Sequence, residues 1–356
     1  MEKSHDDTSK IRRLVVVGDI HGCLEGFTRV MQLASFIDRK GEWRIAPGEH
    51  LVICGDMIDE GASSREVVFL IRRLTEEFSG RVTVLLGNHE LLLLRTLATG
   101  DDRLNWETAR SWGRAGGGER LGEYLDRHQV PSLGTSHLQT CFQQSLLEKR
   151  RDDYPEEYVS ACAAIPTAVA RQAAALLGDI LEKDGTLPWL KRLPVAAKIG
   201  TWGFFHGGPP CGWTAGVAAL NRTFAALLEQ QRWDHPLLDP YAGRESPVAA
   251  RHWWQDGEEA VDRLFEAYGM KQVAFGHSPG ALNGLFGRLA QRWGKIFKAD
   301  TYFSLGIEGY LEIVGDEVRA VYAEAGRRTF NRLYKDQPEL PPAERLWPVR
   351  KGDDQA

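Results

Sequence analysis

Three short apolar runs in the first ninety residues each end in a glycine-flanked polar loop. They are residues 14–17, 50–54 and 81–86. Runs this short and this rich in β-branched residues predict buried strands. Segments with helical spacing follow the runs, at about 24–37, at about 65–78 and from 91 onward. This alternation of strands and helices predicts an α/β fold, in which sites collect at the carboxyl ends of the strands.

The pattern changes after the third run. Residues 98 to about 195 are rich in alanine, leucine, glutamate and arginine, which predicts a mostly helical insertion. It is either a lid or substrate-facing wall, or a plain helical layer without a role in chemistry. Strand-like runs then resume at 198–205 and 272–275. Three more runs, at 296–299, 310–314 and 318–322, predict a second sheet that closes the domain. We therefore expect a flexible leader at 1–13, one domain at 14–326 and a polar surface tail at 327–356.

The composition is that of an ordinary globular protein, with 43% hydrophobic and 26% charged residues. The net charge of −5 argues against a nucleic-acid binder that relies on a basic surface. The sequence has neither a signal peptide nor an apolar run long enough to cross a bilayer, which predicts a cytoplasmic protein without a membrane partner. The five cysteines are scattered and without a Cys-x-x-Cys pair, so we expect free thiols.

Candidate chemistry lies in the loops at the strand ends. In Gly-Asp-Ile-His-Gly at 18–22, residues two apart in an extended stretch point the same way, so Asp19 and His21 can reach one cation. Four further motifs share this glycine-flanked character: Gly-Asp-Met-Ile-Asp-Glu-Gly at 55–61, Gly-Asn-His-Glu at 87–90, His-Gly-Gly at 206–208 and Gly-His-Ser at 276–278. Mixed nitrogen and oxygen donors suit Mn²⁺, Fe or Zn²⁺. Two divalent ions that share one carboxylate would use this many ligands.

The same residue types also have structural explanations. Asp19 and Asp56 could cap helices, and Asn88 could be a turn residue. His206 could be a turn histidine and His277 a satisfied core histidine. The convergence of five such motifs favours the metal interpretation.

The order of these motifs resembles the calcineurin-like metallophosphoesterases, and within them the phosphoprotein phosphatase family. Gly-Asp-x-His-Gly followed in register by Gly-Asn-His-Glu is a highly specific pair. Residues 193–208, 246–251, 269–278, 299–301 and 308–313 look similar to the Shewanella-like bacterial phosphatases, whereas residues 112–118 look like other bacterial members. The resemblance implies a β-sandwich flanked by helices, two divalent metal ions with Mn²⁺ foremost, and hydrolysis of phosphoesters.

The resemblance also assigns roles to individual residues. Asp19, His21 and His277 would bind the first metal, Asp56 would bridge the two, and Asn88 and His206 would complete the second. His89 stands where the family has its general acid, and Asp59 where it has the partner carboxylate of that acid. Arg251 stands at a phosphate-clamping arginine, with Asn88 beside it, although Arg251 could instead stack on the neighbouring tryptophans. A metal-bridging hydroxide would attack phosphorus while His89 protonates the departing oxygen.

One residue departs from the family pattern. Glu60 stands where the family usually has arginine, next to a dianionic substrate. Either Glu60 points away and another arginine such as Arg65 or Arg114 replaces it, or the substrate differs from a phosphoserine or phosphothreonine protein.

Three functions follow from these observations. The first is a dimetal phosphatase that hydrolyses phosphomonoesters, with a phosphoprotein or a small phosphoester as its substrate. The second is a nucleotide-polyphosphate hydrolase of the diadenosine tetraphosphatase kind, although those enzymes usually have aspartate where Glu90 stands. The third is a catalytically weak phospho-ligand sensor, against which the intact His89–Asp59 pair argues.

Overall fold

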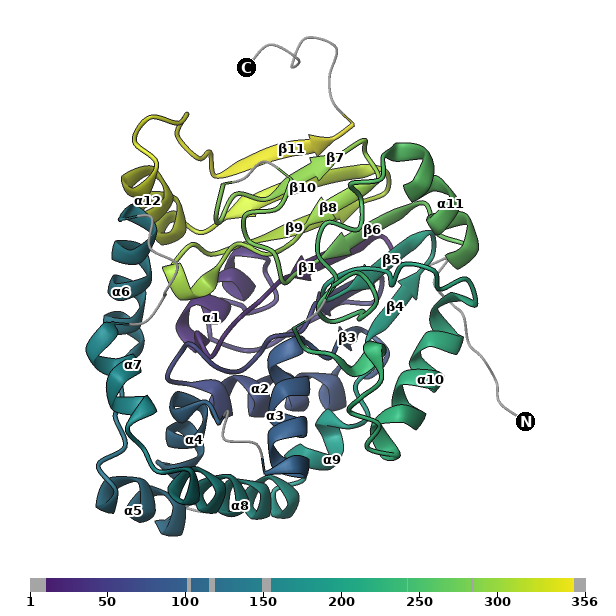
Figure 1. The fold of residues 1–356 in the computed structure, drawn as a ribbon. Coiled ribbons are helices and arrows are strands. Elements are labelled where there is room, and N and C mark those ends of the chain that lie inside the picture. Colours follow the sequence, from purple (N-terminus) through teal and green to yellow (C-terminus); the bar gives the residue numbers. More distant parts are fainter. Residues whose placement is uncertain are drawn as a thin grey trace.

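The computed structural model describes residues 11–100, 104–114, 119–148, 155–241, 243–282 and 285–348. Within them the chain forms two sheets with helices on their outer sides (Figure 1). The first sheet has the order β11-β10-β9-β1-β2-β3 and the second the order β4-β5-β6-β8-β7. The predicted leader up to residue 10, residues 115–118 and the end of the predicted tail from residue 349 lie outside the described residues.

The strands of the first sheet are β1 (Arg13–Val17), β2 (Glu49–Ile53), β3 (Val82–Val84), β9 (Gly309–Val314), β10 (Glu317–Tyr322) and β11 (Ala343–Trp347). Strands β1, β2 and β3 are parallel, and β9, β10 and β11 continue the sheet in antiparallel fashion. The second sheet contains β4 (Ala196–Ile199), β5 (Trp202–Phe205), β6 (Gln272–Phe275), β7 (Ala290–Arg292) and β8 (Ile296–Lys298), of which β5, β6 and β8 are parallel.

The central strands are apolar on both faces because each face is covered. Leu14 and Val16 of β1 share a core between the two sheets with Phe204 of β5 and Phe297 of β8. The alternate residues of β1 belong to a second core that includes side chains of α1 (Leu24–Leu33) and α2 (Ser64–Glu77). This double coverage explains the continuous apolar runs in the sequence. The fold confirms the expected β-sandwich flanked by helices.

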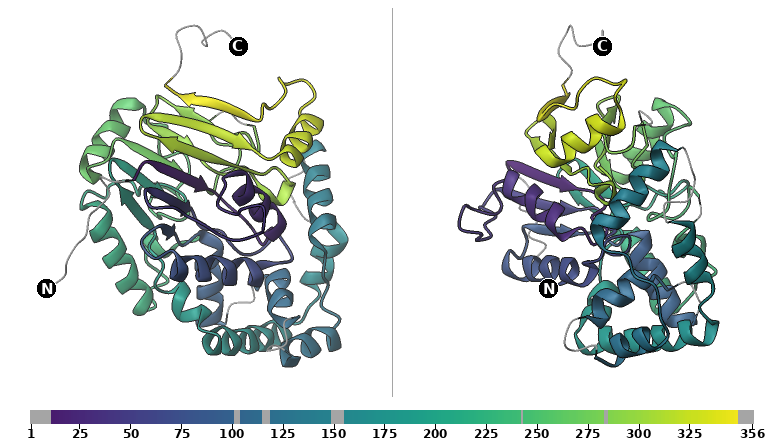
Figure 2. Two further views of the ribbon diagram at one scale, coloured as in Figure 1. Left: turned by 180° about the vertical axis from the view of Figure 1, so that it is seen from behind. Right: turned by 90° about the vertical axis from the view of Figure 1, so that its left-hand side faces the viewer.

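The residues between β3 and β4 form a helical layer along one side of the molecule, seen from both sides in Figures 1 and 2. Its helices are α3 (Asn88–Thr99), α4 (Trp106–Gly113), α5 (Glu119–Arg127), α6 (Thr135–Leu147), α7 (Glu156–Ala163), α8 (Thr167–Lys183) and α9 (Thr186–Leu190). Among the described residues, no single helix is long and apolar enough to cross a membrane, while the bent pair α7–α8 passes that test only when the two are joined. The five cysteines are free, as expected.

The remaining helices cover the second sheet and the end of the chain. They are α10 (Gly216–Glu229), α11 (Glu258–Tyr268) and α12 (Glu324–Leu333), with short 3₁₀ turns at Pro236–Leu238 and Phe303–Leu305. The predicted tail from residue 327 thus contains most of α12 and the edge strand β11, which pairs with β10. The polar composition of the tail had not indicated a paired strand. Edge strands tolerate such residues because one side of the strand meets solvent.

His50 on β2 provides a pH-dependent test of this fold. The side chain is buried, its Nε2 lies 2.8 Å from the Thr83 hydroxyl, and burial lowers its pKa to about 4. The unfolded chain binds this proton near pH 6.5, so the stability falls as the pH drops from about 6.5 to about 4, by about 3 kcal/mol from this group. Urea unfolding across that range should show a smaller loss in His50→Gln than in the exposed control His128→Gln. Equal losses would contradict the assignment.

Candidate metal centre and active site

The candidate residues come from the carboxyl ends of parallel strands in both sheets. Asp19 follows β1, Asp56 follows β2, Asn88 and His89 begin α3 after β3, His206 follows β5, and His277 follows β6. Asp300 follows β8 in the same way. Because these strands run parallel, their ends meet at one edge of the sandwich. Side chains as far apart in sequence as Asp19 and Asp300 therefore meet at this edge.

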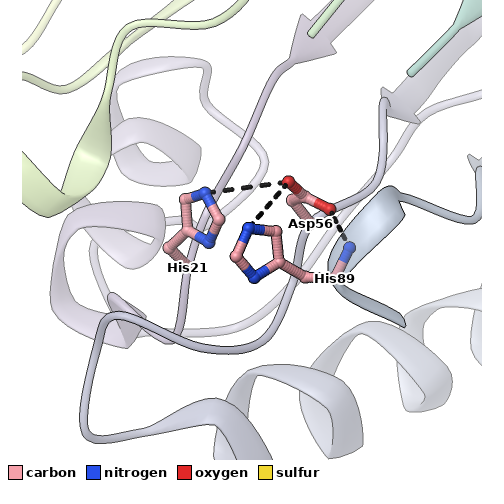
Figure 3. A group of neighbouring side chains, drawn as sticks. All are labelled: His21, Asp56 and His89. Atoms are coloured by element: carbon pink, nitrogen blue, oxygen red, sulfur yellow. Dashed lines mark hydrogen bonds and ion pairs between the residues drawn. The ribbon is translucent and has the colours of Figure 1, made fainter. Parts of the chain in front are cut away.

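Asp56 lies at the centre of this group. Its Oδ2 is 3.2 Å from Nε2 of His206, 3.8 Å from Nε2 of His21 and 3.9 Å from Nε2 of His89. Its Oδ1 accepts a hydrogen bond of 3.0 Å from the backbone N–H of His89 (Figure 3). Burial alone would raise the pKa of Asp56, but its interactions with the imidazoles of His206 and His89 hold it well below its usual range. Asp56 is thus an ionised carboxylate that several imidazoles share.

Two of the imidazoles are oriented by backbone carbonyls. Nδ1 of His21 lies 2.9 Å from the carbonyl oxygen of Ile58, and Nδ1 of His206 lies 2.7 Å from that of Cys54. A carbonyl only accepts, so each Nδ1 donates and each Nε2 is left facing Asp56. Metal-binding histidines are commonly fixed in this manner. Nε2 of His206 also lies 2.9 Å from the side-chain oxygen of Asn88.

His277 and Asp19 complete the group on the side of β6. Both carboxylate oxygens of Asp19 accept from the backbone N–H of His277, at 2.9 and 3.0 Å. The rings of His206 and His277 have centroids 5.0 Å apart. A Cβ at Gly18 would lie 2.6 Å from the Cα of Asp300, so a glycine is needed where these two loops meet.

The donor set fits divalent cations. Among the described residues, two clusters have all their ligand atoms within 4.8 Å of one another; they are His21, Asp56 and His89, and Asp56, His206 and His277. They share Asp56, the residue expected to bridge two metals. Burial, together with the neighbouring Asp300 and Asp56, raises the pKa of Asp19 well above its usual range. Buried carboxylates this close to one another require compensating positive charge, which divalent cations would supply.

Several residues of the site have left-handed backbone conformations. The φ angles are 47° at His21, 50° at Asp56, 69° at Asp59, 55° at Glu60 and 61° at His277. Side chains other than glycine rarely adopt this region, and such residues concentrate at functional sites. Sequence patterns do not indicate this feature, because glycines flank the motifs while the residues with left-handed backbone lie inside them.

His89 and Asp59 are in direct contact. Nδ1 of His89 lies 2.7 Å from Oδ2 of Asp59, and 26% of the His89 side chain remains exposed. Burial alone would lower the pKa of His89, but the charges of Asp56 and Asp59 raise it well above its usual value. The surroundings of His89 therefore favour its charged form, and part of its side chain meets solvent.

Glu90 organises the loops that carry these side chains. Its carboxylate accepts from the backbone N–H groups of Asp56 at 3.0 Å, Met57 at 2.7 Å, Ile58 at 3.2 Å and Gly87 at 2.9 Å. The side chain is fully buried. The sequence had marked Glu90 only as a difference between two enzyme families. Its contacts show that it joins the loop after β2 to the start of α3.

A cavity of about 380 Å³ opens over the group. Its wall contains Asp19, His21, Asp56, Asn88, His89, His277 and Arg251, together with Glu60, His252, Trp254, Ser278, Phe286, Asp300 and Tyr302. Arg251 is part of this wall, whereas His206 and Asp59 are not among the residues that line it. The sequence reading had not singled out Asp300, although an acidic residue at the end of a strand is the same signal that identified Asp19. Phe286 and Tyr302, with centroids 5.7 Å apart, carry no such signal.

Glu60 faces the cavity. Its Oε1 is 3.8 Å from Nε2 of His21, and its other oxygen accepts from the hydroxyl of Ser304. The first alternative, in which Glu60 points away, is therefore wrong. Arg65 lies over the ring of Phe69 and Arg114 donates to Ser132, so neither replaces the missing arginine in the described cavity wall.

Comparisons with known proteins agree with this geometry. Residues 12–164 match the family model for calcineurin-like phosphoesterases. The Shewanella-like protein phosphatase 2 of Arabidopsis thaliana is 31% identical over 211 residues, which is 56% of this chain and 47% of the relative. A symmetrical bis(5′-nucleosyl)-tetraphosphatase of Buchnera aphidicola subsp. Acyrthosiphon pisum is 36% identical over 78 residues, 22% of this chain and 24% of the relative. The chain thus spans about half or less of the length of these relatives.

Among solved structures, the cold-active protein-tyrosine phosphatase of a psychrophilic Shewanella species has the same fold. The TM-score is 0.58 at 17% identity, over 94% of this chain and 80% of that one. Together these findings show that residues 12–164 match the calcineurin-like phosphoesterase model and that the relatives include a Shewanella-like protein phosphatase.

Proposed function

We propose that this chain is a metal-dependent phosphatase that hydrolyses phosphomonoesters. The observation that supports this most is the arrangement around Asp56, where one carboxylate faces three imidazoles and one of these, His89, also binds Asp59. Asp19, His21 and His277 would hold the first cation and Asn88 and His206 the second, with Asp56 between them. When bound, the cations would supply a water of lowered pKa and offset the charge of the phosphoryl group.

The protein's own groups account for binding and proton transfer. Arg251 lines the cavity, and its guanidinium would pair with the phosphoryl oxygens, which suit a planar donor. His89 would give the proton on Nε2 to the departing oxygen as the bond from that oxygen to phosphorus breaks. Asp59 keeps Nδ1 bonded and favours the charged imidazole before the transfer. The products would be an alcohol and inorganic phosphate.

The shape of the cavity bears on the substrate. Trp254, Phe286 and Tyr302 form an aromatic part of its wall close to the candidate metal ligands. Such a wall would accept an aryl group next to the phosphate, as in phosphotyrosine, as well as an alkyl phosphoserine or phosphothreonine. The same wall supports a second candidate, hydrolysis of a dinucleoside polyphosphate, because a base can stack on an aromatic ring. The match to the bis(5′-nucleosyl)-tetraphosphatases favours testing it.

Three assays separate the candidates. Turnover of p-nitrophenyl phosphate by the Mn²⁺-loaded protein, lost on chelation and restored by Mn²⁺, would support a phosphatase over a phospho-ligand sensor. Phosphopeptides with phosphoserine, phosphothreonine and phosphotyrosine, assayed beside diadenosine tetraphosphate, would then identify the substrate class. Efficient cleavage of the dinucleotide with inert phosphopeptides would overturn the phosphomonoesterase proposal in favour of the second candidate.

Arg251 should matter mainly for binding the phosphate. We expect Arg251→Ala to lower kcat/KM about 10- to 100-fold, the range of one charge-assisted bond of 1.5–3 kcal/mol. Arg251→Lys should recover only part of this loss, because lysine cannot present two parallel donors. Arg232→Ala, at an exposed arginine that binds Asp234, is the matched control. If Arg251→Ala and Arg232→Ala behaved alike, Arg251 would have no part in phosphate binding.

Glu60 places a negative charge in the cavity that would receive a dianionic phosphate. We expect Glu60→Gln, which removes only the charge, to raise kcat/KM for phosphopeptides about tenfold. Glu60→Arg, which restores the family residue, should raise it further. Steady-state kinetics on the same phosphopeptide panel would measure both. If neither variant turned over phosphopeptides faster than the wild type, Glu60 would not limit the reaction.

A further inference from the structure

The first helix of the insertion, α4, reaches the acid pair. Thr108 lies in the middle of this helix and is fully buried. Its hydroxyl donates to Oδ1 of Asp59. It also accepts, at 3.1 Å, from the backbone N–H of the same residue, which the Ser64 hydroxyl shares at 3.1 Å. The other oxygen of Asp59 binds His89. Thr108 thus holds both the carboxylate and the backbone of Asp59, whose φ of 69° needs such support.

The position of Thr108 is fixed by the packing of α4. Trp106, Ala109 and Trp112 belong to the apolar core that includes α2. On its polar side, Ser111 accepts from the backbone N–H of Arg65 at 2.8 Å, where α2 begins. Ser64 adds a hydroxyl 3.3 Å from that of Thr108. The helix is therefore held against α2 on two sides, and its threonine cannot move away from Asp59 without breaking these contacts.

Glu107, the residue before Thr108 on α4, connects this helix to the rest of the insertion. The buried Glu107 accepts from the backbone N–H of Leu133 at 2.6 Å and from the hydroxyl of Tyr158 at 3.3 Å. Residues before α6 and on α7 are thereby bonded to the helix that supports Asp59. A plain covering layer would not require polar contacts with the acid pair.

From these contacts we propose that Thr108 is a positioning residue for the His89–Asp59 pair, so that the insertion is part of the acid site. The inference rests on the proposed function for its catalytic meaning. The hydroxyl keeps the Asp59 carboxylate in the plane and at the distance that hold Nδ1 of His89. Without it, His89 would present its proton to the leaving oxygen less often, and esters with poor leaving groups would suffer most.

The test compares Thr108→Val, which removes only the hydroxyl, with Thr108→Ser, which keeps it. We expect Thr108→Val to lower kcat about 10- to 100-fold on an alkyl phosphate but only a few-fold on p-nitrophenyl phosphate, whose leaving group needs little protonation. Thr108→Ser should remain near wild type. Thr96→Val is the matched control, because Thr96 is also buried and its hydroxyl has no hydrogen-bond partner among the described residues. Should Thr108→Val fail to fold, Thr108→Cys, with a weaker donor, should give an intermediate loss.

A second readout does not depend on turnover. In the Zn²⁺-loaded protein labelled with ¹⁵N-histidine, the Nδ1 proton of His89 should resonate far downfield and disappear in His89→Gln. We expect this signal to persist in Thr108→Ser and Thr96→Val and to shift or broaden in Thr108→Val. An unchanged signal together with an unchanged leaving-group dependence in Thr108→Val would overturn the inference. Absence of turnover in the wild type would overturn the proposed function instead. The His89 resonance would still show whether Thr108 positions the His89–Asp59 hydrogen bond.

Discussion

Replacing Asp56 by asparagine will reduce phosphoester turnover by about 10³-fold or more and remove at least one of the bound cations. The carboxylate is buried, ionised and within 4 Å of Nε2 of His206, His21 and His89. Asparagine has nearly the same shape but no charge. The substitution therefore removes the charged ligand that both candidate metal positions would share. Kinetics with p-nitrophenyl phosphate and elemental analysis of the purified protein would measure the two effects.

Asp234→Asn is the matched control for this change, because Asp234 is exposed and pairs only with Arg232 among the ion pairs of the described residues. It should retain full turnover and metal content. Circular dichroism should show that both variants are folded. An Asp56→Asn protein with wild-type turnover would contradict the shared role of this carboxylate.

Replacing Glu90 by alanine will have the largest effect on stability, a loss of about 4 kcal/mol. Four backbone N–H groups, those of Asp56, Met57, Ile58 and Gly87, would lose their buried acceptor. Each unsatisfied group costs about 1–3 kcal/mol, and water that enters the gap would recover part of this. Because the same loops carry the candidate ligands, metal content should fall as well. Urea unfolding and elemental analysis would measure both losses.

A second buried glutamate offers the control. Glu308 binds Arg29 away from the cavity, so Glu308→Ala should also lower the stability but leave the metal content of the folded protein unchanged. Glu90→Gln keeps one acceptor oxygen and should be intermediate in both measurements. Metal content that stayed the same in Glu90→Ala would show that Glu90 supports the fold alone.

Much of the architecture could be predicted from local patterns. The run at 14–17 reads as a strand because both of its faces are buried, and the glycine-flanked loop after it has to lie at the carboxyl end of that strand. The same reasoning located Asp56 and His277. What it could not give was the pairing of strands far apart in sequence. Residues 310–314 and 318–322, expected in the second sheet, instead extend the first sheet as β9 and β10, because β9 pairs with β1. In the second sheet, β5 pairs with the distant β6.

Other features could not be predicted because the residue types involved usually indicate a different environment. Lys298 ends a buried strand and is itself fully buried, with its ammonium donating to the carbonyls of Pro279 and Leu285. A lysine in a sequence indicates a surface position, and only tertiary contacts reverse this. Thr108 is a further case, because a threonine within a predicted helix gives no sign that it touches an aspartate 49 residues earlier.

The central claim is that two divalent ions share Asp56. Anomalous diffraction at the manganese edge, from crystals grown with Mn²⁺, measures this directly. We expect two peaks per chain about 3.5–4 Å apart, one beside His21 and one beside His206, with the Asp56 carboxylate between them. A single peak, or two peaks of which either lies away from Asp56, would contradict the account.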